Sequence, residues 1–258
     1  MRLMKRILSA AAVLALSASL LVGCSSGTAS SVPVSASSAA ESTVSSVEET
    51  ASSAVDENEA AAAQLLNDLT GSYQELWPVI LADEYKQTWL DDCTALVGED
   101  NAEAAFEKLS SMVTGDVYGE DAVKAYANGG GAYFCGFTNS LATLTFDGET
   151  STISGTDKDG NVLFSHTYHY IGMEPVHGLY EFESDDADSG EFTYFFLAPD
   201  TSAETYHIEF RYGSDAEALS QYDAGEYAYW VASGISTDCG QTMIDNCIEL
   251  FCTENLAG

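Results

Sequence analysis

The sequence predicts a mainly β domain, an antiparallel barrel or sandwich, with flanking helices. Short runs of β-branched and aromatic residues follow one another between residues 132 and 212. Turn dipeptides such as Asp147-Gly148 and Asp159-Gly160 separate these runs, which is typical of hairpins. Helical patterns occupy both ends of the domain. Roughly six to eight strands at this spacing are typical of a barrel or a sandwich.

Three helices are expected before the strands, over residues 57–69, 73–96 and 102–113. Asp56 and Glu59 have the spacing of a capping box at the start of the first helix. Pro78 interrupts the second helix, and Asp100 is the expected N-cap of the third. From about residue 117 the pattern changes to short β-type runs. A last amphipathic helix is expected within residues 236–256, with Ser236 or Thr237 as its cap.

The expected strands follow from the runs between the turn signals. They cover residues 132–137, 141–146, 151–156, 162–171, 178–183, 191–198 and 205–212.

The N-terminal segment reads as a bacterial lipoprotein signal. Arg2, Lys5 and Arg6 precede an apolar run that is shorter than the ~20 residues of a membrane-spanning helix. The run ends in Leu-Val-Gly-Cys, which looks like a lipobox whose cysteine, Cys24, is acylated. We therefore expect a signal peptide over 1–23, a lipidated Cys24 with a disordered Ser/Ala-rich tether over 24–56, and a globular domain over 57–258.

The charge of the chain is strongly acidic. The formal net charge is −33, with 41 acidic residues against eight basic ones. Three of those eight lie in the expected signal peptide, so the exported domain is more acidic still. Such a field repels nucleic acid and attracts cations, and the sequence predicts no nucleic-acid partner.

The cysteines agree with an exported protein but do not form a zinc-binding motif. Five remain beyond Cys24, and no C-x2-C spacing occurs among Cys93, Cys135, Cys239, Cys247 and Cys252. An odd number leaves at least one thiol free or paired between chains. We expect buried thiols together with one or two disulfides of unassigned connectivity.

Motifs of known catalytic chemistry do not occur in the sequence. It has no Gly-x-Ser-x-Gly, no Walker loop, no dinucleotide fingerprint and no His-Glu-x-x-His. The acidic segments 157–161 and 183–191 are better explained as turns than as calcium loops, because the first has its glycine in the wrong place. The sequence therefore predicts a binding protein rather than an enzyme.

The sequence contains four histidines, and they are the first candidates for metal ligands. His166 and His169 lie three apart in a strand pattern, so they face opposite sides of the sheet. His177 follows Pro175 in a predicted loop. His207 and Glu209 lie two apart, so they share a strand face, and Arg211 lies on that face too. This face is either part of a metal site or an ordinary ion pair of Glu209 with His207 or Arg211.

Segments around this pair carry a family resemblance. Residues 203–215 (AETYHIEFRYGSD) resemble the zinc-binding segment of the ZinT (YodA) family, in which His-x-His precedes a glycine and an acidic end. The segments 71–78, 178–183, 191–200 and 214–230 are similar to others of that family, in the same order. The resemblance implies a lipocalin-like (calycin) barrel with flanking helices, binding zinc at the barrel mouth for extracytoplasmic zinc acquisition.

The resemblance assigns ligands residue by residue, and the site is altered. His207 matches the first histidine of His-x-His, and Glu209 replaces the second; a carboxylate oxygen can bind zinc at ~2.0–2.2 Å. The third histidine of the family, three residues before its Ala-Pro turn, is Phe195 in this sequence. His169 and His177 are the candidates for a replacement ligand.

Together these features predict a lipid-anchored protein on the extracytoplasmic face of the cell membrane. It would bind Zn²⁺ through His207 and Glu209, for metal acquisition or buffering, with a metal transporter as a candidate partner. The alternative is a metal-free barrel that binds a small organic ligand or a partner protein. That alternative rests on the aromatic cluster of Tyr194, Phe195 and Phe196, which ordinary core packing also explains.

Overall fold

The computed structural model describes residues 57–257 of the chain. The expected signal peptide, the lipidation site Cys24 and the tether up to residue 56 lie outside the described residues. Within residues 57–257, no helix combines the length and the apolar character needed to cross a membrane.

Eight antiparallel strands close into a barrel, in which each strand pairs with its neighbours in sequence and β1 also pairs with β8. The fold class that the sequence predicts is therefore confirmed, and the barrel rather than the sandwich is its form. The strands are β1 (Gly71–Glu75), β2 (Thr143–Asp147), β3 (Thr152–Thr156), β4 (Val162–Met173), β5 (Tyr180–Ser184), β6 (Tyr194–Leu197), β7 (Ile208–Gly213) and β8 (Ala232–Ser236).

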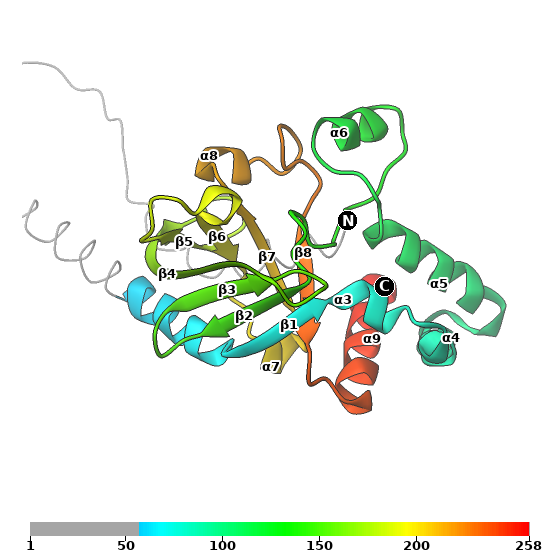
Figure 1. The fold of residues 1–258 in the computed structure, drawn as a ribbon. Helices are drawn as coiled ribbons and strands as arrows, with labels where there is room; N and C mark the ends of the chain where they lie inside the picture. Colours follow the sequence, from blue (N-terminus) through cyan, green and yellow to red (C-terminus); the bar gives the residue numbers. More distant parts are fainter. Residues whose placement is uncertain (1–56, 258) are drawn as a thin grey trace, which may run out of the picture.

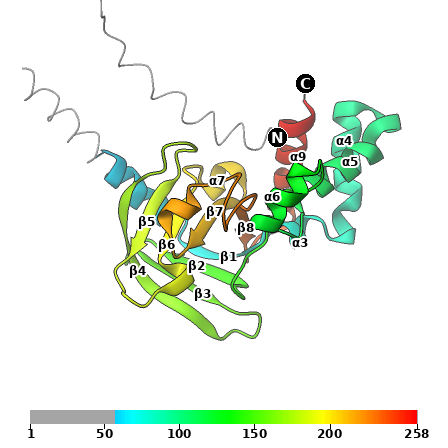
Figure 2. The same ribbon diagram turned by 90° about the horizontal axis from the view of Figure 1, so that it is seen from above.

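Helices form a layer at one side of the barrel, as the two views in Figures 1 and 2 show. This layer contains α3 (Leu76–Ile80), α4 (Lys86–Val97), α5 (Glu99–Val113), α6 (Glu120–Ala127) and α9 (Gln241–Leu256). The short helices α7 (Ser202–Thr205) and α8 (Ala216–Leu219) flank β7, and a helix over 57–68 precedes β1. Two 3-10 turns complete the described elements, η2 (Asp83–Tyr85) and η3 (Gly190–Phe192).

Two hydrophobic cores hold these layers together. Aromatic side chains fill the barrel, among them Phe164, Phe195, Phe210 and Tyr212. A second core lies between the outer wall of the barrel and the helical layer, and it contains Trp77, Trp89, Ile235 and Phe251, among others. Because strand residues alternate between the two faces of a sheet, β8 contributes Ala232 to the first core and Ile235 to the second.

The structure corrects five expectations about local structure. Residues 73–75, expected at the start of the second helix, belong to β1 (Gly71–Glu75), because pairing with both β2 and β8 satisfies their backbone groups and closes the barrel. Residues 120–127 form α6, and residues 132–137 form no strand apart from the single bridge of Phe134 with Trp230. Gly98 and Gly240 are the N-caps of α5 and α9, in place of Asp100 and of Ser236 or Thr237.

The five cysteines of the described residues are all thiols. The expected disulfides are therefore absent there. Cys93 of α4 and Cys252 of α9 come closest, with 3.9 Å between their sulfur atoms, which is well beyond the ~2.05 Å of a disulfide bond.

Gly148, at the predicted Asp-Gly turn, lies at a close contact between the barrel and the helix over residues 57–68, and a substitution there tests how tight this contact is. A Cβ atom at this position would lie 2.4 Å from Asn67 Cα and 2.6 Å from Leu66 O, and backbone atoms cannot move aside easily. We expect Gly148→Ala to lower the free energy of unfolding by ~1–3 kcal/mol in urea titrations. Gly172→Ala is the matched control, because its Cβ would meet only Glu181 Oε2, at 3.6 Å. Equal stabilities of the two variants would contradict the close approach.

Candidate functional site

His207 and Glu209 lie side by side on the outer face of the barrel wall. Ile208, Phe210 and Tyr212 alternate with them and pack into the barrel interior. The distance from His207 Nε2 to Glu209 Oε1 is 3.8 Å. The two side chains lie on the same side of the chain, as their spacing predicts, although β7 begins at Ile208 and His207 comes just before it. Both side chains point toward the helical layer and not into the barrel interior.

Backbone geometry fixes the orientation of the His207 ring. Helix α7 ends at Thr205, and the next residue, Tyr206, has a left-handed φ of 65° that turns the chain toward β7. Nδ1 of His207 lies 2.7 Å from the carbonyl oxygen of Thr205. A carbonyl can only accept, so Nδ1 carries the proton and donates it. Nε2 is therefore the nitrogen that faces Glu209, as in metal sites where a backbone carbonyl selects the ligand nitrogen.

A small cavity lies beside the pair, enclosed by α3 and α9. Its volume is about 10 Å³, close to the space that one water molecule needs. Four side chains that can bind a metal line it, and the rest of the lining is apolar or aromatic: His207, Glu209, Cys247 and Glu254, with Leu76, Trp77, Ile80, Leu250 and Phe251.

Cys247 and Glu209 approach the imidazole from different sides. The sulfur of Cys247 lies 4.0 Å from Nδ1, whereas the carboxylate of Glu209 is near Nε2. Burial acts to lower the pKa of His207, but its hydrogen bonds with Cys247 and Glu209 raise the pKa well above the ordinary value. The ring therefore holds a proton that a metal ion would have to displace from Nε2.

The donor pair has the right chemistry and nearly the right spacing for zinc. Zinc binds nitrogen and oxygen at ~2.0–2.2 Å, which puts two such ligands of a tetrahedral ion roughly 3.3–3.6 Å apart. The observed 3.8 Å needs only a small side-chain movement to reach this spacing. Among the described residues, no group of three or more His, Cys, Asp or Glu side chains is arranged to hold a metal ion. The pair thus fits the metal as two ligands of an open site.

The structure does not bring His169 or His177 into this cavity. His169, on β4, is exposed, and its Nδ1 lies 2.7 Å from Asp185 Oδ1. His177 is buried in the loop after β4, where its ring packs on Tyr222 and its backbone N–H donates to Glu174. Each candidate for a third ligand therefore has a separate environment.

Phe195 also lies away from the pair. It stands opposite Tyr212 in the β6–β7 register, and the two rings are 5.4 Å apart within the barrel core. Its side chain is fully buried, and so is that of Phe196. The aromatic cluster is thus core packing, and the position that carries a histidine in the ZinT family faces the barrel interior in this chain.

Cys247 and Glu254 are lining residues that the sequence reasoning did not assign to the site. Both lie on α9, far along the chain from β7. Their spacing with Phe251, at i, i+4 and i+7, is the one signal in the sequence that places them on a single helix face. Nothing local in the sequence indicates that this face meets His207.

Comparisons with known proteins give structural neighbours only. No family model matches the sequence, and no curated protein does. The chain is similar to the zinc-bound ZinT-like domain of AdcA from Streptococcus pneumoniae, with 16% identity and a TM-score of 0.45, over 72% of this chain and 89% of that one. It is also similar to zinc-bound AdcA from the same organism, with 15% identity and a TM-score of 0.42, over 75% of this chain and 35% of that one. The eight-stranded barrel is consistent with the ZinT-like fold that the sequence predicts.

Restoring a histidine at position 195 tests the placement of this residue. We expect Phe195→His to leave zinc affinity unchanged, because the new ring would point into the barrel and away from Glu209. The variant should lose ~2–5 kcal/mol of unfolding free energy, since it replaces a buried phenyl ring by a polar group. Calorimetric zinc titration and urea unfolding measure the two effects, with Phe195→Leu as the control for volume. A gain in zinc affinity would contradict the assigned face.

Proposed function

We propose that the domain binds Zn²⁺ as cargo through Nε2 of His207 and the carboxylate of Glu209. The observation that carries this proposal is the anchored imidazole. Thr205 holds the proton of Nδ1, and Nε2 faces a carboxylate across 3.8 Å at the edge of a water-sized cavity. An ordinary ion pair does not need the adjacent space.

The chemistry of the pair suits reversible binding. Two protein ligands leave coordination positions open for water or another ligand, whereas a closed four-ligand site is structural. The acidic surface of the chain concentrates cations near the site. The domain would therefore hold zinc weakly and release it, as metal acquisition or buffering requires.

The remaining parts of the proposal rest on the sequence. Cys24 would be acylated and would anchor the protein to the extracytoplasmic face of the cell membrane, with the segment 24–56 as the tether. A metal transporter in the same membrane would receive the zinc. The role is binding and not catalysis, because the sequence shows no recognisable catalytic arrangement.

Zinc titration of the purified chain, stripped of metal beforehand, tests the site. We expect His207→Ala to abolish calorimetric binding, because it removes the nitrogen ligand. Glu209→Gln should weaken binding at least roughly tenfold, since the neutral amide is a much poorer zinc ligand. His169→Ala is the matched control, because this exposed histidine has the same chemistry outside the cavity. An unchanged isotherm for His207→Ala would contradict the proposed site.

Fractionation of cells tests the anchor. We expect the wild-type chain in the membrane pellet and the Cys24→Ser variant in the soluble fraction, because the variant lacks the thiol that accepts lipid. Immunoblots of the two fractions measure the distribution. A Cys24→Ser variant that stays in the pellet would rule out lipidation at this residue as the anchor.

A further inference from the structure

Two buried thiols of the helical layer meet where α4 packs on α9. The sulfur atoms of Cys93, on α4, and Cys252, on α9, lie 3.9 Å apart, although the two residues are 159 positions apart in the sequence. Both side chains are fully buried, and both residues are thiols in the structure. The fold thus brings into contact two groups that oxidation can join. We call them the α4–α9 thiol pair.

Aromatic packing holds the two helices at this distance. Trp89 lies one turn before Cys93 on α4, and its ring packs edge-on against Phe251, the neighbour of Cys252, with 5.9 Å between the ring centroids. The indole N–H of Trp89 donates to the carbonyl oxygen of Ile80 at 2.7 Å, which fixes the ring. A disulfide bond is ~2.05 Å long, so the sulfur atoms must approach by ~1.9 Å, a movement of the size that side-chain rotation produces.

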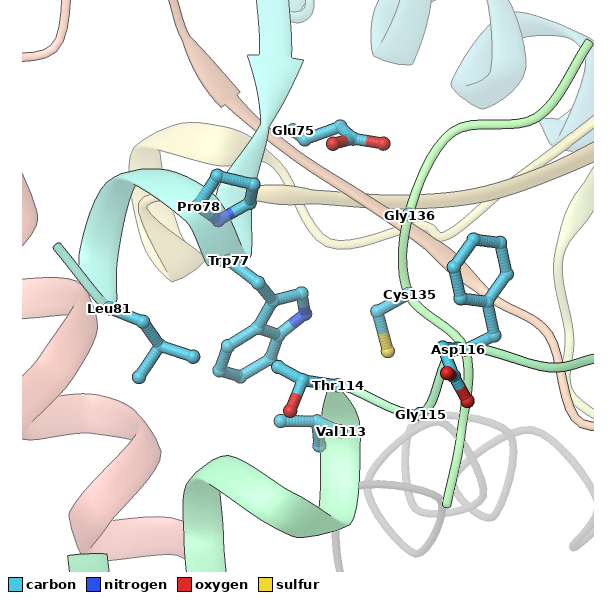
Figure 3. A pocket seen from close by; sticks show the side chains of 11 residues that line it. Glu75, Trp77, Pro78, Leu81, Val113, Thr114, Gly115, Asp116, Cys135 and Gly136 are labelled. Carbon is cyan, nitrogen blue, oxygen red and sulfur yellow. The ribbon is translucent and has the colours of Figure 1, made fainter. Parts of the chain in front are cut away.

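The remaining thiols of the described residues have other surroundings. Cys247 lines the small cavity beside the candidate zinc ligands, and Cys239 lies half-buried just before α9. Figure 3 shows Cys135 in a separate cavity of about 370 Å³, and the described residues that line this cavity include no second cysteine. The α4–α9 thiol pair therefore gives a specific connectivity to cysteines whose pairing the sequence leaves open.

The surroundings of the pair disfavour the thiolate form of both residues. Burial raises the pKa of the Cys93 thiol, and the charge of Asp92 adds to the rise. Burial raises the pKa of the Cys252 thiol as well. The thiolate is the reactive form, and a thiol of high pKa is a slow leaving group in thiol–disulfide exchange. Oxidation is therefore favoured while the chain folds, before α9 covers α4, and a bridge once formed resists reduction.

We propose that Cys93 and Cys252 form a disulfide when the chain folds in an oxidising environment, with a small-molecule disulfide such as oxidised glutathione as the oxidant. The thiolate of one cysteine attacks the oxidant, which forms a mixed disulfide and releases one small thiol. The thiolate of the other cysteine then attacks the protein sulfur of the mixed disulfide and releases the second small thiol. In total, one S–S bond forms and one breaks, and two electrons and two protons pass from the protein to the oxidant.

The bridge would fasten the helical layer across most of the domain. A disulfide stabilises a fold mainly by restricting the unfolded chain, and the effect grows with the length of the closed loop, which here spans 159 positions. Helix α9 also carries Phe251 and Glu254, which line the cavity beside His207. The bridge would thus hold one wall of that cavity against α4. The inference does not depend on zinc binding.

Peptide mapping of the purified chain tests the connectivity. The chain is refolded with oxidised and reduced glutathione in the presence of EDTA, its free thiols are blocked with N-ethylmaleimide, and it is digested with a protease that cuts after glutamate. This cleavage leaves Cys93 in the peptide 85–99 and Cys252 in the peptide 250–254, and the other cysteines in different peptides. We expect mass spectrometry to find these two peptides linked. Two separate blocked peptides, or a link from Cys252 to another cysteine, would overturn the proposal.

Thermal unfolding measures the effect of the bridge on stability. We expect the midpoint of the wild-type chain to be roughly 4–16 °C higher after oxidation than in dithiothreitol. Cys93→Ala and Cys252→Ala should show no such difference, and the comparison of each variant with itself removes the effect of the lost side-chain volume. Cys239→Ala is the matched control and should keep the shift. A wild-type midpoint that reduction leaves unchanged, or a shift that persists in Cys93→Ala, would contradict the bridge.

Discussion

The pairing of β1 with both β2 and β8 is the constraint on which the rest of the structure depends. Tyr73 is opposite Leu144 on one side and Ser236 on the other, so this five-residue strand closes the barrel. The next residue, Leu76, begins α3. Barrel closure therefore holds α3 against the outer wall, where Trp77 contacts Phe251 of α9 with ring centroids 4.9 Å apart. The small cavity beside His207 borders α3, so a shift of β1 would change this cavity.

Strand β7 shows how one run of residues serves two environments. Its inward side chains stack in an aromatic core, and its outward side chains are charged or ionisable. Of the two partners considered for Glu209, His207 is the one the structure selects. Arg211 is fully buried and donates to the carbonyls of Leu219 and Tyr227, with its guanidinium 4.1 Å from the centre of the Tyr222 ring. Those bonds hold the segment after α8 on the barrel. The guanidinium of Arg211 is therefore bound by that segment, away from the cavity beside His207.

The acidic character of the chain has local as well as general consequences. The electric field of the net charge is screened within ~8–10 Å at physiological salt. It therefore raises the rate at which cations meet the protein but does not select one cation over another. Selectivity requires fixed donors at short range. The anchored imidazole beside Glu209 provides such donors for a metal ion.

Period-two alternation and Asp-Gly turns were enough to predict an antiparallel β domain, and the spacing of His207 and Glu209 was enough to place them on one face. These features are local, because they depend on residues within one strand or one turn. Residues 73–75 carry a helical pattern in the sequence, and their strand state depends on partners at β2 and β8 that no local pattern reveals. Cys247 and Glu254 likewise reach His207 only because α9 packs on α3. The sequence by itself determined the class of fold and the candidate pair, whereas the tertiary structure decided what surrounds the pair, because packing between segments distant along the chain sets every distance across the cavity.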